Sequence, residues 1–420
     1  MKKISILLAC LSLYSVGMAQ QEEEQSPIAK IEQKVQEQEE ALTLLKKLKV
    51  SGYIQTQWQH GEKDASLRVG TKNDQKEDTF SRLGIRRGRI KFTYDAGLAS
   101  SVFQLDITEK GVGIKDAYLN VKDPWLQSSS LRIGVFDRPF GNEISYSSSR
   151  RESPERSLIF NTLFPNERDL GAMLTLQAPK TSPLNFLKLE AGLFAGNGIK
   201  PETDSRKDFI GHLSMTKNLG DNVRLGLGTS YYNGGVYQGT DKEYSFSNGA
   251  FQLSQNSANK GKFAKREYYG VDGQLVVLSP LGMTHLRAEY IAGVQPGTAS
   301  GTQSPNFSKL PEHDTFIRTF SGGYAILIQD FGTLPLSAVL KYDWYDPNTK
   351  TSGNEIGQGG TSRADLAYTT FGAGLLWRIS NNLRMQAYYD VVTNEKSSNL
   401  VGYEKDRKDN VFTLRLQYKF

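Results

Sequence analysis

The chain has 420 residues, a formal charge of +6 and a single cysteine, Cys10, so a disulfide framework or a thiolate metal site is excluded. Charged residues make up 23% of the chain and the mean hydropathy is −0.47, which is not the composition of a helical membrane protein. The 40 glycines, 20 tyrosines and 20 phenylalanines instead indicate an all-β chain.

The first residues have the pattern of a secretory signal. Lys2 and Lys3 precede the apolar run Ile4–Val16, and small and polar residues follow, with a cleavage site expected near Ala19. We therefore predict a signal peptide over residues 1–19. Removing the two lysines lowers the formal charge from +6 to +4, and an exported chain with so mild a charge is not expected to bind nucleic acid.

Residues 20–49 differ from the rest of the chain because they lack glycine and aromatic residues and are rich in Glu, Gln and Lys. Their apolar residues follow alternating spacings of three and four, at Ile28, Ile31, Val35, Leu42 and Leu45, with the polar Gln38 filling the gap between Val35 and Leu42. This spacing predicts a short coiled coil in the periplasm, which needs partner helices because about three heptads are marginally stable alone. A solvated surface helix is the alternative interpretation.

From Val50 onward, apolar residues recur at every second position, which is the period of a β-strand with one apolar and one polar face. The last stretch, VFTLRLQYKF, is the clearest case. Leu414 and Leu416 share its apolar face, whereas Arg415 and Gln417 share its polar face.

Tight turns alternate with long polar loops along residues 50–420, which is typical of an outer-membrane β-barrel. We therefore predict an all-β fold, a 16-stranded antiparallel transmembrane barrel preceded by the short helix. The predicted strands are 50–59, 83–95, 100–109, 114–122, 131–139, 170–178, 185–195, 208–218, 223–232, 266–278, 284–294, 315–330, 336–345, 364–379, 383–393 and 410–420.

The charged faces of these strands are assigned to the lumen, because Arg or Lys facing lipid at the midplane costs roughly 2–4 kcal/mol. The predicted inward basic residues are Arg87, Arg89, Lys91, Lys122, Arg132, Lys188, Arg224, Arg287, Lys341, Arg378, Arg384, Arg415 and Lys419. The predicted inward acidic residues are Asp95, Asp106, Asp116, Glu190, Asp272, Glu289, Asp343 and Asp390. This cationic excess predicts an aqueous channel that favours anions. Pairing of the charges across strands is the alternative.

The basic stretch 82–95, RLGIRRGRIKFTYD, is only partly explained by this register. Arg87 faces the lumen in it, so strict alternation points the adjacent Arg86 at lipid. Either Arg86 lies near the outer interface, where the cost falls to roughly 0–1 kcal/mol, or a bulge at Gly84 or Gly88 turns it inward.

The loop 141–168 is long and mixed in character, and it follows the fifth predicted strand. A fully solvated loop has little use for its apolar cluster around residues 158–164, so we expect the loop to fold into the barrel as a constriction with opposed charges. Its predicted constriction residues are Arg150, Arg151, Glu152, Glu155, Arg156 and Arg168.

Enzyme motifs are not found in the sequence: there is no Gly-x-Ser-x-Gly elbow, phosphate loop or His-Glu-x-x-His. The four histidines are scattered without the spacing of metal ligands. We therefore predict no catalytic residue, no metal site and no cofactor. The loops at Asp346–Asn348 and Lys405–Asn410 carry oxygen ligands suited to calcium, but solvated loop residues are the default interpretation.

Residues 50–420 resemble the phosphate-selective porin O and P family, in the form found in Bacteroidetes outer membranes. The resemblance depends on VSGYIQTQWQ, RRGRIKFTYD, KDAYLNVK, LRIGVFDRPFG, the segment from SYSSSRRESPERS to LFPNERDLGAML, and the closing strand. It implies a 16-stranded barrel, usually trimeric, that passes anions through a pore lined by Arg and Lys.

Three hypotheses follow. The first is an outer-membrane porin for passive diffusion of small polar solutes, biased toward anions with phosphate among them, with lipid, small anionic solutes and two further copies of the chain as partners. The second is a barrel without a channel, acting as an adhesin, a structural anchor or a hydrolase. The third is a soluble, exported β-rich binding protein.

Overall fold

The computed structural model of the protein describes residues 34–36, 38–39, 42–43 and 46–420. The chain divides into two compact units, Met1–Leu48 and Lys49–Phe420. The predicted signal peptide and residues 20–33 of the predicted coiled coil lie outside the described residues, and the described residues between 34 and 47 are helical. None of the described helices is long and apolar enough to cross a membrane.

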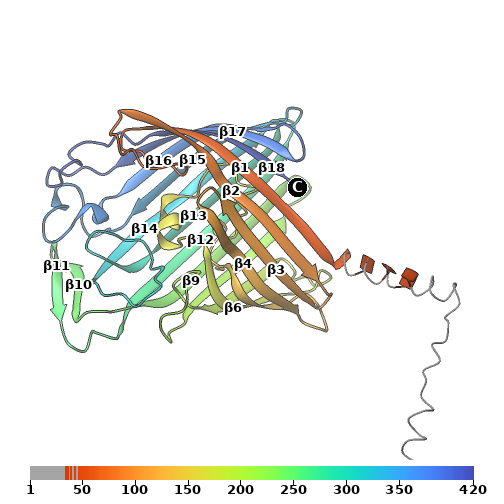
Figure 1. Cartoon of the computed structure of the whole chain (residues 1–420), viewed down its shortest axis with the longest axis horizontal. Coiled ribbons are helices and arrows are strands. Elements are labelled where there is room, and N and C mark those ends of the chain that lie inside the picture. Colours follow the sequence, from red (N-terminus) through yellow and green to blue (C-terminus); the bar gives the residue numbers. More distant parts are fainter. Residues whose placement is uncertain (1–33, 37, 40–41, 44–45) are drawn as a thin grey trace, which may run out of the picture. The chain divides into compact units, whose positions relative to one another are not determined.

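The second unit is a closed antiparallel β-barrel of 16 strands, so the predicted fold class is confirmed (Figure 1). The barrel strands are β1 (Leu48–Glu62), β2 (Thr79–Asp95), β3 (Ala99–Thr108), β4 (Gly111–Lys122), β5 (Ser130–Asp137), β6 (Arg168–Gln177), β7 (Leu187–Phe194), β8 (Asp208–Asn218), β9 (Val223–Tyr237), β12 (Phe263–Ser279), β13 (Gly282–Gly297), β14 (Thr315–Asp330), β15 (Leu336–Asp346), β16 (Tyr368–Arg378), β17 (Leu383–Asn394) and β18 (Val411–Lys419).

The first and last strands close the barrel at a seam. β1 pairs with β18 from Tyr53 opposite Lys419 to Gly61 opposite Val411, and β1 also pairs with β2. Because every barrel strand has two neighbours, no strand edge is left for lipid, where unpaired backbone groups cost several kcal/mol each.

Side chains alternate between the lumen and the outer surface as the sequence period predicts. On β18, Arg415 and Gln417 are buried inside the barrel, whereas Leu416 and Tyr418 are exposed on its outer surface. Tight turns join the strands at one end of the barrel, here the short-turn end, and most connections at the other end, the long-loop end, are long. In outer-membrane barrels the short turns are periplasmic.

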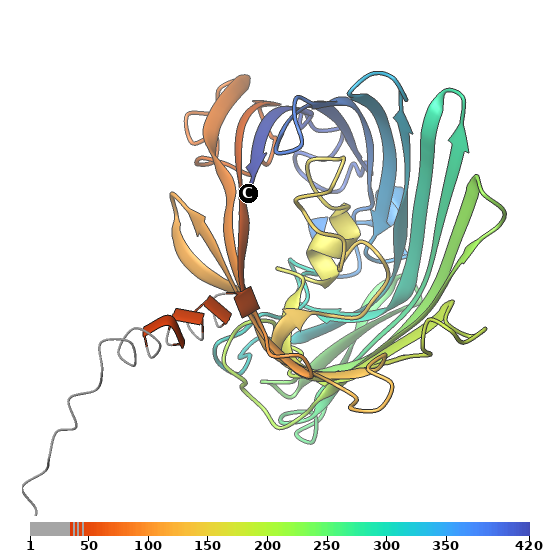
Figure 2. The ribbon, with the colours of Figure 1, turned by 90° about the vertical axis from the view of Figure 1, so that its right-hand side faces the viewer.

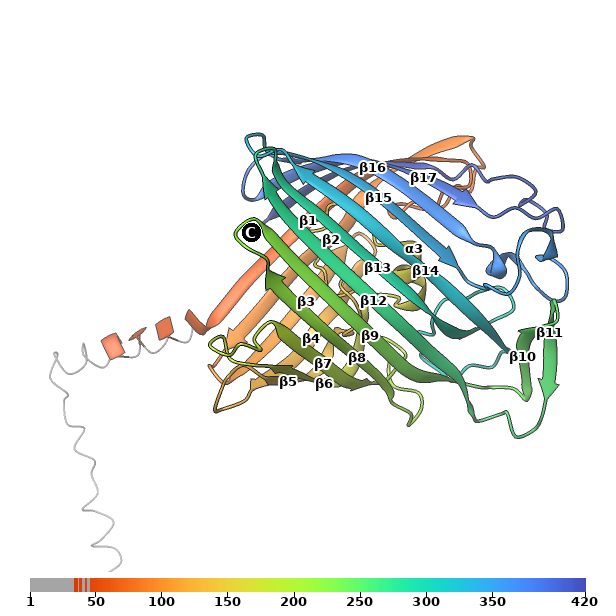
Figure 3. The same cartoon turned by 180° about the vertical axis from the view of Figure 1, so that it is seen from behind.

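The connection between the predicted strands 223–232 and 266–278 is not a plain polar loop. β9 runs on to Tyr237, and the loop then forms a hairpin of β10 (Lys242–Ser247) and β11 (Ala250–Gln255), visible beyond β14 in Figure 3. β10 pairs in parallel with the start of β14, where Tyr244 stacks on Phe316 with ring centroids 4.4 Å apart. β10 and β11 have six residues each, which is too short for the alternation of apolar and polar residues to be clear in the sequence.

The start of the predicted strand 364–379 is also wrong. Arg363–Asp365 forms a 3-10 turn, η2, and β16 begins at Tyr368. The carboxylate of Asp365 is fully buried and accepts hydrogen bonds from Arg318 and Asn348. These contacts hold the backbone at residues 363–365 out of the strand.

Candidate functional site

The connection between β5 and β6, residues 138–167, lies inside the barrel and is called loop 3 here (Figure 2). It contains the short helix α3 (Leu158–Leu163), which is drawn in yellow within the ring of strands. Arg168, predicted as part of this loop, is instead the first residue of β6.

One side of loop 3 packs against the wall through an apolar core. Phe160, Leu163 and Phe164 are almost completely buried. Phe164 contacts Phe140 of the same loop at a centroid distance of 5.0 Å and Tyr268 of β12 at 5.7 Å. This part of the lumen is therefore filled by protein rather than by water.

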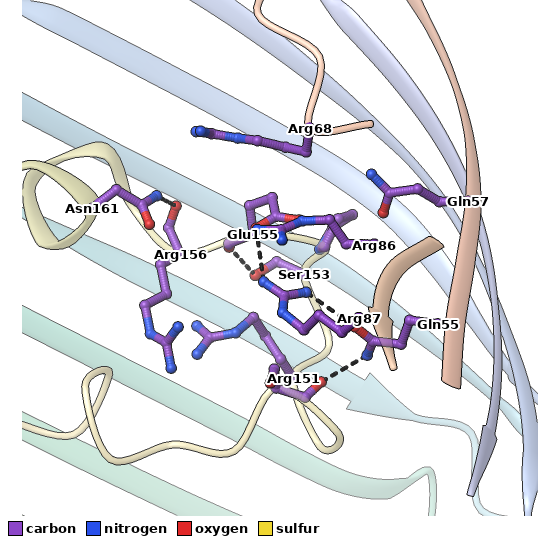
Figure 4. A network of polar contacts seen from close by, with 12 residues as sticks. Gln55, Gln57, Arg68, Arg86, Arg87, Arg151, Ser153, Glu155, Arg156 and Asn161 are labelled. Atoms are coloured by element: carbon purple, nitrogen blue, oxygen red, sulfur yellow. Dashed lines mark hydrogen bonds and ion pairs between the residues drawn. The ribbon is translucent and has the colours of Figure 1, made fainter. Parts of the chain in front are cut away.

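The opposite side of loop 3 is held to the wall by charge. Glu155 accepts hydrogen bonds from Arg86 and Arg87 of β2, at 2.7 and 3.0 Å (Figure 4). It also accepts one from Arg415 of β18 at 2.8 Å. Burial of Glu155 opposes its ionisation, but the three guanidinium groups outweigh burial and hold the pKa of this carboxyl well below its usual range.

A second carboxylate of loop 3, Glu143, has a similar environment. Arg151 donates to it at 2.9 Å, the Ser157 hydroxyl donates at 2.9 Å, and the Lys341 ammonium of β15 lies 3.6 Å away. Burial would raise the pKa of Glu143, but the charges of Lys341, Arg151 and Arg156 lower it overall. Loop 3 therefore carries fixed negative charges that neutralise part of the basic wall.

Further bonds tie loop 3 to the remaining wall. Arg287 of β13 pairs with Glu152. Arg384 of β17 donates to the carbonyl oxygens of Arg150 and Arg151 at 3.2 and 3.1 Å. At the start of β6, Arg168 binds Asp116, and Arg156 and Lys115 bind Glu167.

These contacts divide the free space of the lumen. An outer cavity of about 360 Å³ at the long-loop end and an inner cavity of about 200 Å³ on the short-turn side are both lined by Ser153 and Lys341. Another inner cavity, of about 400 Å³, lies beside strands β1 to β5. Ser153 and Lys341 therefore lie at the boundary between the outer and inner spaces.

The two inner cavities are strongly basic. Their acidic lining residues are three, Asp116, Asp137 and Glu143. Their basic lining residues are nine, Arg89, Lys91, Arg150, Arg151, Arg156, Arg168, Arg287, Lys341 and Lys419. The outer cavity is close to balanced, with four basic residues against five acidic ones.

The other residues predicted to line the pore are spread along the wall. Arg89 lies 3.5 Å from Asp106 and Arg132 lies 3.8 Å from Asp137. Lys188, paired with Glu190, and Arg224 line a further cavity at the short-turn end, and Arg378 pairs with Asp330 at the rim. Most of the basic residues predicted to line the pore thus form ion pairs with carboxylates. This agrees with the alternative interpretation of the sequence, in which the inward charges pair across strands.

Sequence reasoning left the direction of Arg86 open and missed a row of glutamines. Arg86 reaches inward to Glu155, which fits the bulge alternative: next to Gly88, the β2–β3 ladder stops at Arg89. Gln55, Gln57 and Gln59 of β1 face the lumen, and Gln57 accepts from Arg415 at 2.9 Å. Their alternation in YIQTQWQ was the signal available in the sequence.

No protein-family model and no curated protein matches the chain. Among solved structures, the outer membrane channel DcaP of Acinetobacter baumannii aligns with a TM-score of 0.52 at 14% identity, over 89% of this chain and 97% of that one. The barrel has the fold of outer-membrane porins. An anion-selective porin from Comamonas acidovorans aligns with a TM-score of 0.52 at 11% identity, over 89% of this chain and 99% of that one. Pseudomonas putida OprB aligns with a TM-score of 0.56 at 11% identity, over 90% of this chain and 96% of that one.

Proposed function

We propose that the protein is an outer-membrane porin that lets small polar solutes diffuse passively and favours anions. The observation that carries this proposal is the basic lining of the inner cavities beyond the boundary at Ser153 and Lys341. A solute that passes this boundary meets an excess of cations in a confined space, where charge interactions are stronger than in open water.

Phosphate is the anion that the resemblance to the phosphate-selective porin O and P family implies. The inner cavities supply guanidinium groups and serine hydroxyls, from Arg89, Arg150 and Ser147 to Ser149, and such donors suit phosphate oxygens. We therefore propose phosphate as the first anion to compare with chloride. We also propose that a signal peptide occupies residues 1–19 and that a periplasmic coiled coil occupies residues 20–49.

The ion selectivity of single channels tests the proposal. In a KCl gradient across a planar bilayer, we expect stepwise conductance with a reversal potential on the anion side. Lys341→Gln should lower the anion-to-cation permeability ratio by about fivefold, because a charge at a confined site is worth roughly 1 kcal/mol. Lys180→Gln, in an exposed turn, is the matched control and should leave the ratio unchanged.

Two outcomes would reject this assignment. A cation-side reversal potential would remove the anion preference. Absence of any conductance would favour the second hypothesis, a barrel without a channel, for which the apolar packing of Phe160 and Phe164 across one side of the lumen is the supporting observation.

We also propose a homotrimer, with strands β3 to β7 as the contact surface. β5 and β7 have eight residues each, whereas β12 has 17. Eight residues tilted by about 40° rise roughly 20 Å, which is short of the apolar band of about 25 Å. On the outer face of strands β3 to β7, the side chains of Leu119, Ile133 and Leu193 are exposed, and a neighbouring copy of the chain would cover them.

Native mass spectrometry of the detergent-extracted protein should therefore give three copies. A chain without residues 20–49 should still give three copies if the wall makes the contact. A single copy in both cases would remove the proposed interface, and loss of the trimer only in the shortened chain would assign it to the coiled coil.

A further inference from the structure

The outer cavity contains polar groups that the channel proposal does not use. Its charged lining residues form ion pairs between Lys341 and Asp343, between Arg407 and Asp64, and between Arg156 and Glu167, and Glu155 holds its three arginines. Three lining residues, Asp390, Asp409 and Arg68, take part in no ion pair within the described part of the chain.

Asp390 belongs to a row that crosses three strands. On β16, Gly372 pairs with Lys341 of β15 on one side and with Asp390 of β17 on the other. Neighbouring strands lie about 4.8 Å apart, so the backbones of Lys341 and Asp390 are roughly 10 Å apart. The Lys341 ammonium lies instead 3.5 Å from the carboxylate of Asp343 and 3.6 Å from that of Glu143. Lys341 therefore forms no ion pair with Asp390.

Tyr388 fills the space that Gly372 leaves open. A Cβ atom at Gly372 would lie 2.4 Å from the Tyr388 hydroxyl, so the ring lies directly over this glycine. The side chain is only 2% exposed, yet its hydroxyl has no hydrogen-bond partner among the described residues, although it lines the outer cavity. A buried hydroxyl without a partner costs free energy, which a bound solute would recover.

Arg68 supplies the opposite charge. It belongs to the loop between β1 and β2, where its backbone N–H donates to the Gln59 side chain at 2.7 Å. Its side chain is exposed to the outer cavity and extends into the lumen in Figure 4, with no contact drawn to its neighbours. The cavity therefore offers the guanidinium of Arg68 together with the Tyr388 hydroxyl and two carboxylates that form no ion pair within the described residues, Asp390 and Asp409.

We propose that the outer cavity is a binding subsite for zwitterionic solutes, namely α-amino acids and short peptides. The ammonium group binds Asp390 and the Tyr388 hydroxyl, and the carboxylate binds Arg68, which can hold it through two parallel hydrogen bonds. The cavity, at about 360 Å³, lies within the range of small-molecule sites. This proposal rests on the proposed porin function, since it names a solute class that the channel would take up.

Calorimetric titration of the full-length protein in detergent tests the subsite without requiring conduction. Glycylglycine, a zwitterion, should bind at pH 7 about tenfold more tightly than N-acetylglycylglycine, which lacks the ammonium group, or glycylglycine amide, which lacks the carboxylate. Equal binding of the three probes, or no binding of any, would overturn the subsite.

Variants assign the roles. Asp390→Asn should weaken glycylglycine about tenfold and leave N-acetylglycylglycine unchanged, whereas Arg68→Gln should weaken both. Tyr388→Phe removes only the hydroxyl and should weaken glycylglycine severalfold, which provides a second readout if Asp390→Asn fails to fold. Asp221→Asn, in the exposed turn between β8 and β9, is the matched control.

Each proposal can fail separately. Glycylglycine binding without channel conductance in bilayers would overturn the porin function and leave the subsite. Anion-selective conductance with unchanged glycylglycine binding in Asp390→Asn would overturn the subsite and leave the porin function.

Discussion

Glu155→Gln is expected to lower the free energy of unfolding by about 3–5 kcal/mol and to increase anion selectivity. The substitution keeps the shape of the side chain but leaves Arg86, Arg87 and Arg415 without their shared counter-charge in a confined site. Denaturant unfolding in lipid vesicles measures the first effect, and the reversal potential in a KCl gradient measures the second.

The control for this prediction is Glu202→Gln. Glu202 pairs with Lys207 in an exposed loop, and such a surface pair contributes about 1 kcal/mol or less. Equal effects of Glu155→Gln and Glu202→Gln would show that the three arginines do not depend on Glu155.

Acid provides an independent check on Glu155. Its folded pKa is held below the ordinary value of about 4.3, so its contribution is complete above that value and is lost as the pH falls through the folded pKa. The stability difference between the wild type and Glu155→Gln should therefore persist to about pH 4 and shrink in stronger acid. A difference that disappears already near pH 6 would contradict the depressed pKa.

Phe164→Ala is expected to destabilise the protein by about 3–5 kcal/mol and to admit larger solutes. Phe164 contacts Phe140, Tyr232 and Tyr268, and the guanidinium of Arg138 lies 4.9 Å from its ring centre. Removing the ring leaves a cavity in the apolar core that fixes loop 3 to β9 and β12. Unfolding measurements and the size limit for solute entry into vesicles test the two effects.

Phe331→Ala is the matched control, because Phe331 lies 38% exposed in the turn between β14 and β15. Its cost should be about 0.5 kcal/mol or less. An unchanged solute size limit in Phe164→Ala, together with the expected loss of stability, would mean that the charged contacts alone hold loop 3 in place.

The sequence was sufficient to predict the barrel and its strand number because alternation is a local property. Each strand shows it independently, so an error of a few residues at 364–379 or at the end of β9 did not alter the count. The sequence could not show which inward charges are neutralised, because Glu155 is 69 residues from Arg86 and 260 from Arg415 along the chain.

The apolar core inside the lumen was hidden for a different reason. In the pair Tyr231 and Tyr232, the first lies toward the outer surface and the second is fully buried in the lumen. Tyr268 and Tyr269 divide in the same way. Because an aromatic residue suits lipid and an apolar core equally well, assignment by charge cannot distinguish its two environments.

The position of Glu155 also has a consequence for assembly. Its arginine partners belong to β2 and β18, on either side of β1, so the carboxylate bridges the seam where the N-terminal and C-terminal strands meet. β18 is therefore joined to β1 and β2 by the backbone pairing at the seam and also by Glu155 from the middle of the chain. An insertion intermediate that lacks β18 has no complete site for Glu155. Docking of loop 3 and closure of the wall are therefore expected to be one cooperative step.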